Sequence, residues 1–436
     1  MLLNNLPVEL SVIIPALNEK ENLSILLPKL NQILQTRSVN YEIIVIDENA
    51  DLETRSIIQD NGCLLLSPDC KGYGAALKAG IEIAQGCYIV TMDADLSHSP
   101  DFIISLWETR QSADIIIASR YVPGGKAIMP LSRLVLSKIL NKVFSRGLDL
   151  MVQDMSSGFR LYNASIIKKK SYESNDFDIL QELLVNALLE GFNVLEIPFT
   201  YQPRQHGSSH ARVFKFGLKY LHTFNKLWRL RNSIASADYD ARAFVTLMPP
   251  QRYWQRQRFK HITNMIRGEN KCMDVGCGSS RILGALPDGS VGLDIQMRKL
   301  RYSRRYNKKY INGSAIALPI ASESIKCLIC SQVIEHIPRG SVFSELDRVL
   351  SPSGLLVLGT PDYSKWEWIL TEKLYKFILP QAYADEHITH YTYQEIIDEF
   401  NMKRGYTVEN MHYILHGELI ISLRKPNTHG SMKYSS

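Results

Sequence analysis

Short apolar runs alternate with amphipathic segments through the first half of the chain. The run at residues 10–16 ends in a proline and is typical of a buried parallel strand, and residues 23–34 then repeat leucine and isoleucine at helical spacing. Further predicted elements are strands at 41–46, 63–66 and 88–92 and a helix at 75–84. This alternation predicts a doubly wound α/β sheet, which binds its ligands at the carboxyl ends of its strands.

Carboxylates stand at the ends of two of these strands. Asp47 follows the strand at 41–46, and Asp93 and Asp95 follow the strand at 88–92. Because the fold brings these strand ends to one edge of the sheet, we expect the three side chains to lie together. Two carboxylates one residue apart can share a divalent cation that also bridges a nucleotide diphosphate. For Asp47, capping of a helix is the alternative role.

Six motifs occur in order between residues 10 and 211. They are Ser11–Glu19, Lys71–Gly74, Met92–His98, Ala118–Gly125, Ser157–Arg160 and Pro203–Ser209. Together they resemble the motifs of family-2 glycosyltransferases with a GT-A fold, and the last two narrow the resemblance to dolichyl-phosphate mannosyltransferases. The resemblance implies inverting transfer of a hexose, with mannose favoured, from a GDP- or UDP-sugar to a polyprenyl or dolichyl phosphate. A soluble phosphorylated acceptor is the alternative.

The resemblance also implies roles in donor binding. Pro15, Glu19 and Asp47 would line the pocket of the nucleobase and ribose. Asp93 and Asp95 would hold Mg or Mn against the donor diphosphate, and Asp95 is counted among the catalytic residues. Such an ion neutralises charge on the departing diphosphate, which is the main electrostatic task in glycosyl transfer.

Arginines are expected to receive the phosphates. The resemblance implies that Arg120, Arg133 and Arg204 bind phosphate oxygens of donor or acceptor, a task that suits the bidentate guanidinium group. The resemblance implies a catalytic role for Arg120 and Arg204. It also implies that Arg204 binds the acceptor phosphate, together with Arg133 and Ser209. His98 is interpreted as a solvated loop histidine, with contact to the acceptor as the alternative.

Two segments mix basic residues with apolar and aromatic ones. Residues 213–232 contain no acid, and residues 131–150 form the second segment. Basic amphipathic helices can lie in the interface of an anionic bilayer, and packing on the protein is the alternative. No run of about 18 apolar residues occurs, so no transmembrane helix is predicted. The polyprenyl phosphate and the membrane surface are thus both expected partners.

Length and composition limit the remaining possibilities. A chain of 436 residues predicts two or three domains, and a hydrophobic content of 45% lets each bury a core. A net charge of +6 is too mild to indicate nucleic-acid binding. Seven scattered cysteines, an odd number, are typical of reduced thiols. We therefore expect a cytoplasmic, peripherally membrane-associated protein, with no prediction of its oligomeric state.

A second alternation of strands and helices follows a change in pattern. Residues 235–250 are polar and end in Pro249 and Pro250, which predicts a linker. A buried strand at 271–275 then leads to Gly276 and Gly278, where the backbone can approach a ligand closely. A further strand ends at Asp294, an acid placed to bind ribose hydroxyls.

The order of elements over residues 250–425 resembles class I S-adenosylmethionine-dependent methyltransferases. The resemblance implies that Asp274, Gly276 and Gly278 surround the methionine part of the cofactor and that Asp294 binds its ribose. His387, in the titratable segment 385–391, is the candidate base for methyl transfer to a sugar or glycan hydroxyl. The alternatives are that 385–391 caps the next helix, or that the domain is a non-catalytic scaffold.

The predicted organisation is therefore that of a bifunctional enzyme with two Rossmann-like domains. A glycosyltransferase domain spans 1–234 and ends in the basic amphipathic helix. The linker at 235–250 leads to a methyltransferase domain at 251–426, and residues 427–436 form a tail.

Overall fold

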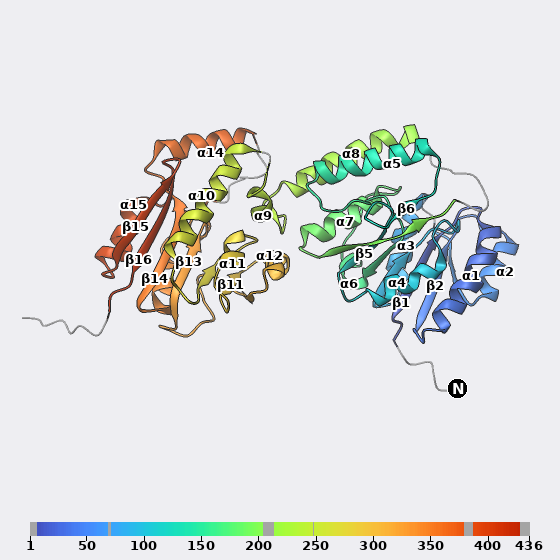
Figure 1. Ribbon diagram of the computed structural model, residues 1–436, viewed down its shortest axis with the longest axis horizontal. Coiled ribbons are helices and arrows are strands. Elements are labelled where there is room, and N and C mark those ends of the chain that lie inside the picture. Colours follow the sequence, from blue (N-terminus) through green and yellow to red (C-terminus); the bar gives the residue numbers. More distant parts are fainter. Residues whose placement is uncertain (1–6, 69–70, 204–212, 247, 379–386, 428–436) are drawn as a thin grey trace, which may run out of the picture. The chain divides into compact units, whose positions relative to one another are not determined.

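The computed structural model describes residues 7–68, 71–203, 213–246, 248–378 and 387–427 (Figure 1). The chain divides into two compact units. Unit 1 comprises residues 1–188 and 192–231, and unit 2 comprises residues 189–191 and 232–436. Each unit is built around its own seven-stranded sheet with helices, so the predicted α/β class is confirmed for both halves.

In unit 1 the strand order is β3-β2-β1-β4-β7-β5-β8. Strand β1 pairs in parallel with β2 and β4, whereas β7 runs antiparallel to β4 and β5. The strands are β1 (Leu10–Pro15), β2 (Tyr41–Ile46), β3 (Leu64–Leu66), β4 (Tyr88–Thr91), β5 (Ile115–Ser119), β7 (Arg160–Asn163) and β8 (Val194–Pro198); β6 (Lys126–Ala127) and β9 (Thr200–Tyr201) form a separate pair. The carboxyl ends of β1, β2 and β4 therefore meet at one edge.

The helices of unit 1 follow from local signals that the sequence carries. Along α1, buried leucines at 23, 26, 27 and 30 recur at helical spacing and enter the core. Helix α2 begins after Asp51, whose side chain accepts a hydrogen bond from the backbone N–H of Thr54 (2.7 Å), so Asp51 and not Asp47 is its cap. The helices are α1 (Lys20–Gln35), α2 (Leu52–Asp60), α3 (Tyr73–Ile83), α4 (Ile103–Glu108), α5 (Leu131–Gly147), α6 (Ala164–Ile167), α7 (Ile179–Leu189) and α8 (Val213–Arg231), with a 3₁₀ turn at Pro100–Phe102.

Helices α5 and α8 lie side by side (Figure 1). The ring of Phe144 on α5 meets the rings of Tyr220 and Phe224 on α8 edge-on, at centroid distances of 5.9 and 5.2 Å. Two cations of the basic segment turn into unit 1: Lys226 forms an ion pair with Glu182 (2.9 Å), and the buried Arg231 donates to the carbonyl of Leu148. For Lys226 and Arg231, the alternative of packing on the protein therefore holds.

The guanidinium of Arg160 braces the loop that precedes β7. Its side chain is fully buried and donates hydrogen bonds to the carbonyl oxygens of Met155, Ser157 and Leu180, at 2.6, 2.7 and 2.7 Å. A buried polar group is stable only when its hydrogen bonds are satisfied, and here backbone carbonyls supply the acceptors. Arg160 thus fixes the backbone of residues 155–157 from inside the core.

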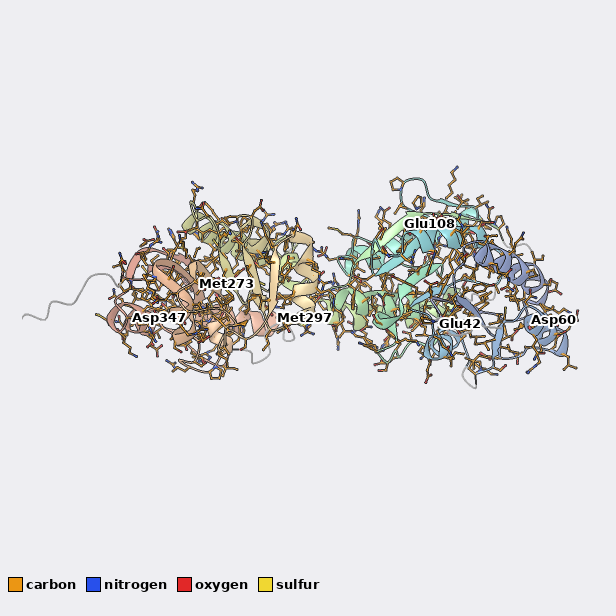
Figure 2. The ribbon with its side chains drawn as sticks, turned by 90° about the horizontal axis from the view of Figure 1, so that it is seen from below. Glu42, Asp60, Glu108, Met273, Met297 and Asp347 are labelled. Carbon is orange, nitrogen blue, oxygen red and sulfur yellow. The ribbon has the colours of Figure 1, made fainter. Side chains whose placement is uncertain are left out.

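The sheet of unit 2 has the order β12-β11-β10-β13-β14-β16-β15. Strands β10 to β14 pair in parallel, and β16 runs antiparallel to both β14 and β15. The strands are β10 (Met273–Val275), β11 (Val291–Asp294), β12 (Lys309–Asn312), β13 (Ile325–Ser331), β14 (Leu350–Pro361), β15 (Thr407–Ile414) and β16 (Glu418–Arg424). Met273, marked in Figure 2, belongs to the core at the centre of this sheet.

Two features of unit 2 differ from the sequence prediction. Pro249 and Pro250, predicted to end the linker, are the first residues of α10, which is possible because the first helical turn needs no backbone N–H donor. Helix α9 forms inside the predicted linker 235–250. The helices are α9 (Tyr239–Ala243), α10 (Pro249–Met265), α11 (Arg281–Ala285), α12 (Met297–Ser303), α13 (Phe343–Val349), α14 (Trp366–Ile378) and α15 (Tyr393–Ile397), with 3₁₀ turns at Arg304–Tyr306 and Ile334–His336 and a π-helix at Asp398–Met402.

Among the described residues, no helix combines the length and the hydropathy that crossing a bilayer requires.

Candidate active sites

A cavity of about 710 Å³ opens at the carboxyl edge of the sheet in unit 1. Of the residues predicted to bind substrates, six line it: Pro15, Glu19, Asp93, Asp95, Arg120 and Arg133. Asp47 is buried and accepts a hydrogen bond from the backbone N–H of Asn49 (2.9 Å), and burial raises its pKa. Its neighbour Glu48 lines the cavity instead and accepts the N–H of Gly72 (3.2 Å). The lining of the cavity thus includes Glu48 but not Asp47.

Asp93 and Asp95 reach the cavity from the loop after β4. Asp93 accepts a hydrogen bond from the hydroxyl of Tyr73 (3.3 Å), and Asp95, which is buried, accepts from the backbone N–H and the hydroxyl of Ser97. These contacts hold two carboxylates of one short loop against the same cavity. Carboxylate oxygens are the ligands that Mg and Mn prefer, so the residues present fit the implied ion.

His98 lies in the wall of this cavity, and the expectation of a solvated loop histidine is wrong. The side chain is buried because its ring stacks on Phe159 at 4.9 Å. Its Nδ1 accepts the backbone N–H of Asp93 (3.0 Å), while Nε2 lies 3.7 Å from the Asp93 carboxylate. Burial lowers the pKa of His98, so the neutral ring carries its hydrogen on Nε2 and directs it toward Asp93.

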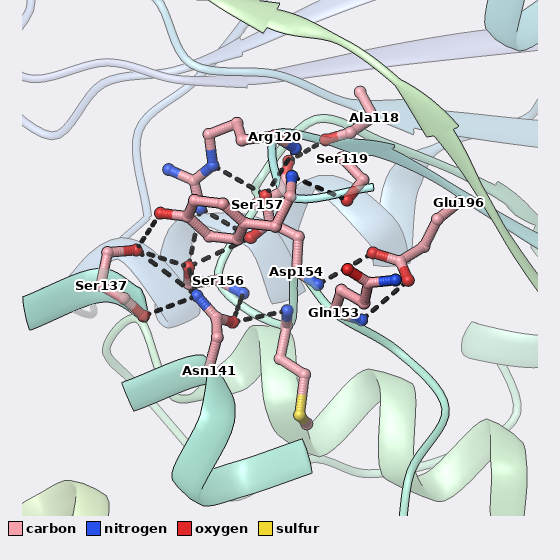
Figure 3. Close-up of polar contacts among 12 residues, drawn as sticks. Ala118, Ser119, Arg120, Ser137, Asn141, Gln153, Asp154, Ser156, Ser157 and Glu196 are labelled. Atoms are coloured by element: carbon pink, nitrogen blue, oxygen red, sulfur yellow. Dashed lines mark hydrogen bonds and ion pairs between the residues drawn. The ribbon is translucent and has the colours of Figure 1, made fainter. Parts of the chain in front are cut away.

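Arg120 forms a bidentate ion pair with Asp154 (Figure 3). Nε and Nη2 of Arg120 donate to the two carboxylate oxygens, each at 2.7 Å, and Nη2 also donates to the hydroxyl of Ser156 (2.7 Å). Burial alone would raise the pKa of Asp154, but Arg120 holds it below its usual value. Asp154 is not among the predicted site residues, because it follows no predicted strand and belongs to none of the motifs.

The same network reaches α5 through Asn141 (Figure 3). The side-chain oxygen of Asn141 accepts the backbone N–H groups of Met155 and Ser156, and its amide nitrogen donates to the hydroxyl of Ser156 (2.9 Å). Glu196 accepts the N–H groups of residues 153 and 154 from the other side. Helix α5 is therefore fixed to the loop that positions Arg120.

Three further residues were predicted to contact phosphate, and the structure describes one of them. Arg133 is exposed on α5 and lines the cavity. Arg204 and Ser209 lie outside the described residues.

In unit 2 the glycine turn after β10 has the geometry of a ligand cradle. Gly276 and Gly278 have φ angles of 71° and 53°, and a Cβ atom at Gly276 would lie 2.2 Å from Cγ2 of Val333. Asp294 accepts the N–H of Gly278 (2.8 Å), and Asp274 is buried behind the turn. The four predicted residues are thus brought together, and a carboxylate at the end of β11 is the type of group that binds ribose hydroxyls.

Asp240 on α9 contacts this glycine turn, a position that the sequence analysis had assigned to the linker. Its carboxylate accepts from the N–H and hydroxyl of Ser279 (3.2 and 3.1 Å) and lies 3.3 Å from Nζ of Lys299. Burial would raise the pKa of Asp240, but Lys299 and the Ser279 donors hold it below its usual value. Helix α9 is therefore part of the cofactor end of unit 2.

His387 lies next to two other titratable residues. Its ring centroid is 5.0 Å from that of His336, and Glu335 completes the group. Burial raises the pKa of Glu335 to about 7. Residues 385 and 386 lie outside the described residues. Helix α15 is capped by Thr392 together with Glu395, so its cap follows the segment 385–391 and is not part of it.

Comparison with known protein families gives two matches. The family model described as glycosyl transferase family 2 matches residues 11–170, and the model described as methyltransferase domain matches residues 273–358. Both predicted transferase domains, and the GT-A and class I methyltransferase folds that go with them, are thereby confirmed.

Three curated proteins resemble the N-terminal half. A dolichol-phosphate mannosyltransferase of Pyrococcus furiosus is 32% identical over 231 residues, which are 50% of this chain and 64% of that protein. A polyprenol monophosphomannose synthase of Mycolicibacterium smegmatis is 32% identical over 45% of this chain and 79% of its own length. The low-salt glycan biosynthesis hexosyltransferase Agl6 of Haloferax volcanii is 28% identical over 49% of this chain and 52% of its own length.

The burial of Asp274 leads to a prediction about stability. Burial and the neighbouring Asp294 raise its pKa to about 8, whereas an unfolded chain ionises it near pH 4. Between these values folding takes up a proton, so the stability of cofactor-free unit 2 falls as pH rises. We expect Asp274→Asn to be more stable than the wild type, by an amount that grows from pH 5.5 to pH 8 and reaches at least about 1 kcal/mol.

Urea unfolding at both pH values, without nucleosides, measures the difference. Asp288→Asn is the matched control, because Asp288 is fully exposed. A gap between variant and wild type that is the same at the two pH values would contradict the assignment.

Proposed function

Because this chain belongs to glycosyl transferase family 2 through unit 1, we propose that unit 1 transfers a hexose from a GDP- or UDP-sugar to a polyprenyl phosphate. Mannose is the favoured sugar, since the names of two relatives specify mannosyl transfer to dolichol or polyprenol phosphate. One observation carries the proposal: a single cavity joins the carboxylates Asp93 and Asp95 to an apolar groove between α5 and α8.

The groove favours a lipid acceptor over a soluble one. Its apolar lining comes from both helices and consists of Leu136, Ile139, Leu140, Val143, Phe144, Leu221 and Phe224. A soluble phosphorylated acceptor would gain nothing from this surface, whereas an isoprenoid chain buries apolar area at about 25 cal/mol per Å². Arg133 lines the same cavity and supplies a cation for the acceptor phosphate.

The proposed reaction depends on positioning rather than on a strong base. A polyprenyl phosphate is already an anionic nucleophile, so its oxygen can attack the anomeric carbon directly and invert it. A divalent ion at Asp93 and Asp95 would neutralise charge on the departing nucleoside diphosphate. His98 fixes the backbone and carboxylate of Asp93, and Asp154 fixes Arg120. These contacts hold the charged groups in place before substrates arrive.

The acceptor must be reached at a membrane, and α5 offers a surface for this. Five of its apolar side chains are between 43% and 73% exposed, namely Leu131, Val135, Leu136, Ile139 and Val143. Lys138, Lys142 and Arg146 are exposed on the same helix. Exposed apolar side chains flanked by cations suit the interface of an anionic bilayer. We propose peripheral binding through α5, together with the exposed Leu221 and Trp228 of α8.

For unit 2 we propose methyl transfer from S-adenosylmethionine to a hydroxyl of a sugar or glycan. The cofactor would lie on the turn of Gly276 and Gly278, with Asp274 beside its methionine part and Asp294 at its ribose. His387 lies at the carboxyl edge of the same sheet with Glu335, where it can activate the acceptor hydroxyl. The presence of both transferases in one chain supports consecutive action on one glycan.

Sugar transfer is the first activity to measure. With radiolabelled GDP- and UDP-hexoses, polyprenyl phosphate and Mn, we expect label to enter the organic phase, and Asp95→Asn to lower the rate at least 100-fold because the ion loses a carboxylate. Asp101→Asn is the control, since Asp101 is exposed and pairs with Lys29. Label confined to the aqueous phase would favour a soluble acceptor and sink the lipid assignment.

Membrane binding can be separated from acceptor binding. Leu131 and Val135 are exposed on α5 but are not part of the cavity lining. Leu131→Ser combined with Val135→Ser should weaken flotation with anionic vesicles at least tenfold, because each side chain loses about 1.5 kcal/mol or more of burial. Ile25→Ser with Leu64→Ser is the matched control on other exposed elements. Equal flotation of both double variants would argue against α5 as the contact.

Cofactor binding by unit 2 is tested by titration calorimetry with S-adenosylmethionine. We expect one site per chain, and Asp294→Asn should weaken binding at least tenfold because ribose hydroxyls lose a charged acceptor. Asp288→Asn should bind as the wild type does. No heat at saturating cofactor would instead make the domain a scaffold.

A further inference from the structure

Three side chains of unit 2 come together beyond the carboxyl end of β13. Glu335 and His336 belong to the 3₁₀ turn Ile334–His336, and His387 comes from the segment before α15. One potential ligand atom from each residue lies within 4.8 Å of the other two. Among the described residues this is the one group of three such side chains close enough to hold a metal ion.

A buried carboxylate oxygen of Glu335 gives an independent indication of a cation at this position. Its side chain is 0% exposed, and Oε2 accepts a hydrogen bond from the hydroxyl of Thr360 (3.2 Å). The other oxygen, Oε1, is buried and has no hydrogen-bond partner in the part of the chain that the structure describes. Burying an unpaired carboxylate oxygen is costly, and buried carboxylates are normally paired with a cation or coordinate a metal.

One ring nitrogen of His387 is held in place by neighbouring oxygen atoms. Its Nδ1 lies 2.6 Å from the hydroxyl of Tyr363 and 3.5 Å from the carboxylate of Glu372, and Trp368 stacks on the ring. Metal-binding histidines usually have one ring nitrogen held in this way by a neighbouring oxygen, which fixes the ring and the other nitrogen.

We propose that Glu335, His336 and His387 bind a divalent transition-metal ion of the zinc, cobalt or manganese class. Two imidazoles and one carboxylate suit these ions, and three protein ligands leave a coordination position open. Ligand atoms on a tetrahedral ion are about 3.4 Å apart, so side-chain rotations that move them by about 1 Å close the site.

The site adjoins the cofactor turn, which indicates what the open position takes. Val333, two residues before Glu335, packs against Gly276. If unit 2 transfers methyl groups as proposed above, the ion would receive an oxygen of the acceptor, and neighbouring sugar hydroxyls are the chelating group that fits. His387 then acts as a ligand, and its activating effect on the hydroxyl passes through the ion.

Metal binding tests the proposal without any substrate. The full-length chain carrying Asp93→Asn and Asp95→Asn, which removes the carboxylates proposed for the first ion, is stripped with a chelator and titrated with Co²⁺. We expect one equivalent bound, with visible absorption bands from histidine ligation. His336→Ala, His387→Ala and the isosteric Glu335→Gln should each lower the affinity at least tenfold, and His416→Asn, at an exposed site, should not.

The outcomes separate this proposal from the methyltransferase assignment. No binding by the parent, or unchanged affinity and spectrum in His387→Ala and Glu335→Gln, would overturn the metal site whether or not S-adenosylmethionine binds. Thermal unfolding in excess chelator checks that each variant remains folded, because without metal the variant and the parent should unfold at the same temperature. With metal present, only the parent should be stabilised. Cobalt binding without cofactor binding would keep the metal site and reject methyl transfer.

Discussion

The buried ion pair between Arg120 and Asp154 is the contact on which the cavity of unit 1 depends. Taking two charges out of water is costly, and such a pair is tolerated only with good geometry and satisfied neighbours. Here the guanidinium makes two parallel hydrogen bonds, and Asp154 also accepts the backbone N–H of Arg120. Loss of one partner would leave an uncompensated charge, at a cost of about 3–5 kcal/mol. The end of β5 and the loop before β7 are therefore held together.

The ion pair also reduces the net positive charge that Arg120 brings to the cavity. An arginine matched by a carboxylate carries little net charge into its surroundings, so Arg120 alone attracts a phosphate only weakly. In the proposed reaction, attraction of the two phosphorylated substrates would then fall mainly to the ion at Asp93 and Asp95. Asn141 and Ser156 connect the pair to α5, so the helix proposed to meet the membrane is rigidly tied to the charged end of the site.

Local signals in the sequence predicted the α/β class of both halves and several residues of both candidate sites. Strand ends marked Asp93, Asp95 and Asp294, and the glycine turn marked Gly276 and Gly278, because each signal lies within a few residues. Asp154 and Asp240 could not be found in this way. Their roles come from partners 20 to 40 positions away, such as Arg120 for Asp154, and no periodicity encodes such pairs.

His98 and α9 show why burial is harder to predict than element type. A histidine in a loop is usually solvated, but this one is covered by Phe159, which lies far along the chain in the loop before β7. The polar segment 235–250 has no amphipathic pattern, yet α9 forms there because Asp240 finds donors on the cofactor turn. In both cases a tertiary contact overrides a correct local preference.

The contact of Asp240 with Ser279 also defines where the two transferases can be separated. A fragment that began at residue 251 would keep every strand of the methyltransferase sheet but lose the carboxylate that holds the Ser279 backbone and Lys299. The severed turn would then expose an N–H and a lysine that the intact chain keeps paired. An independently folding methyltransferase must therefore start before α9, near residue 232, where unit 2 resumes.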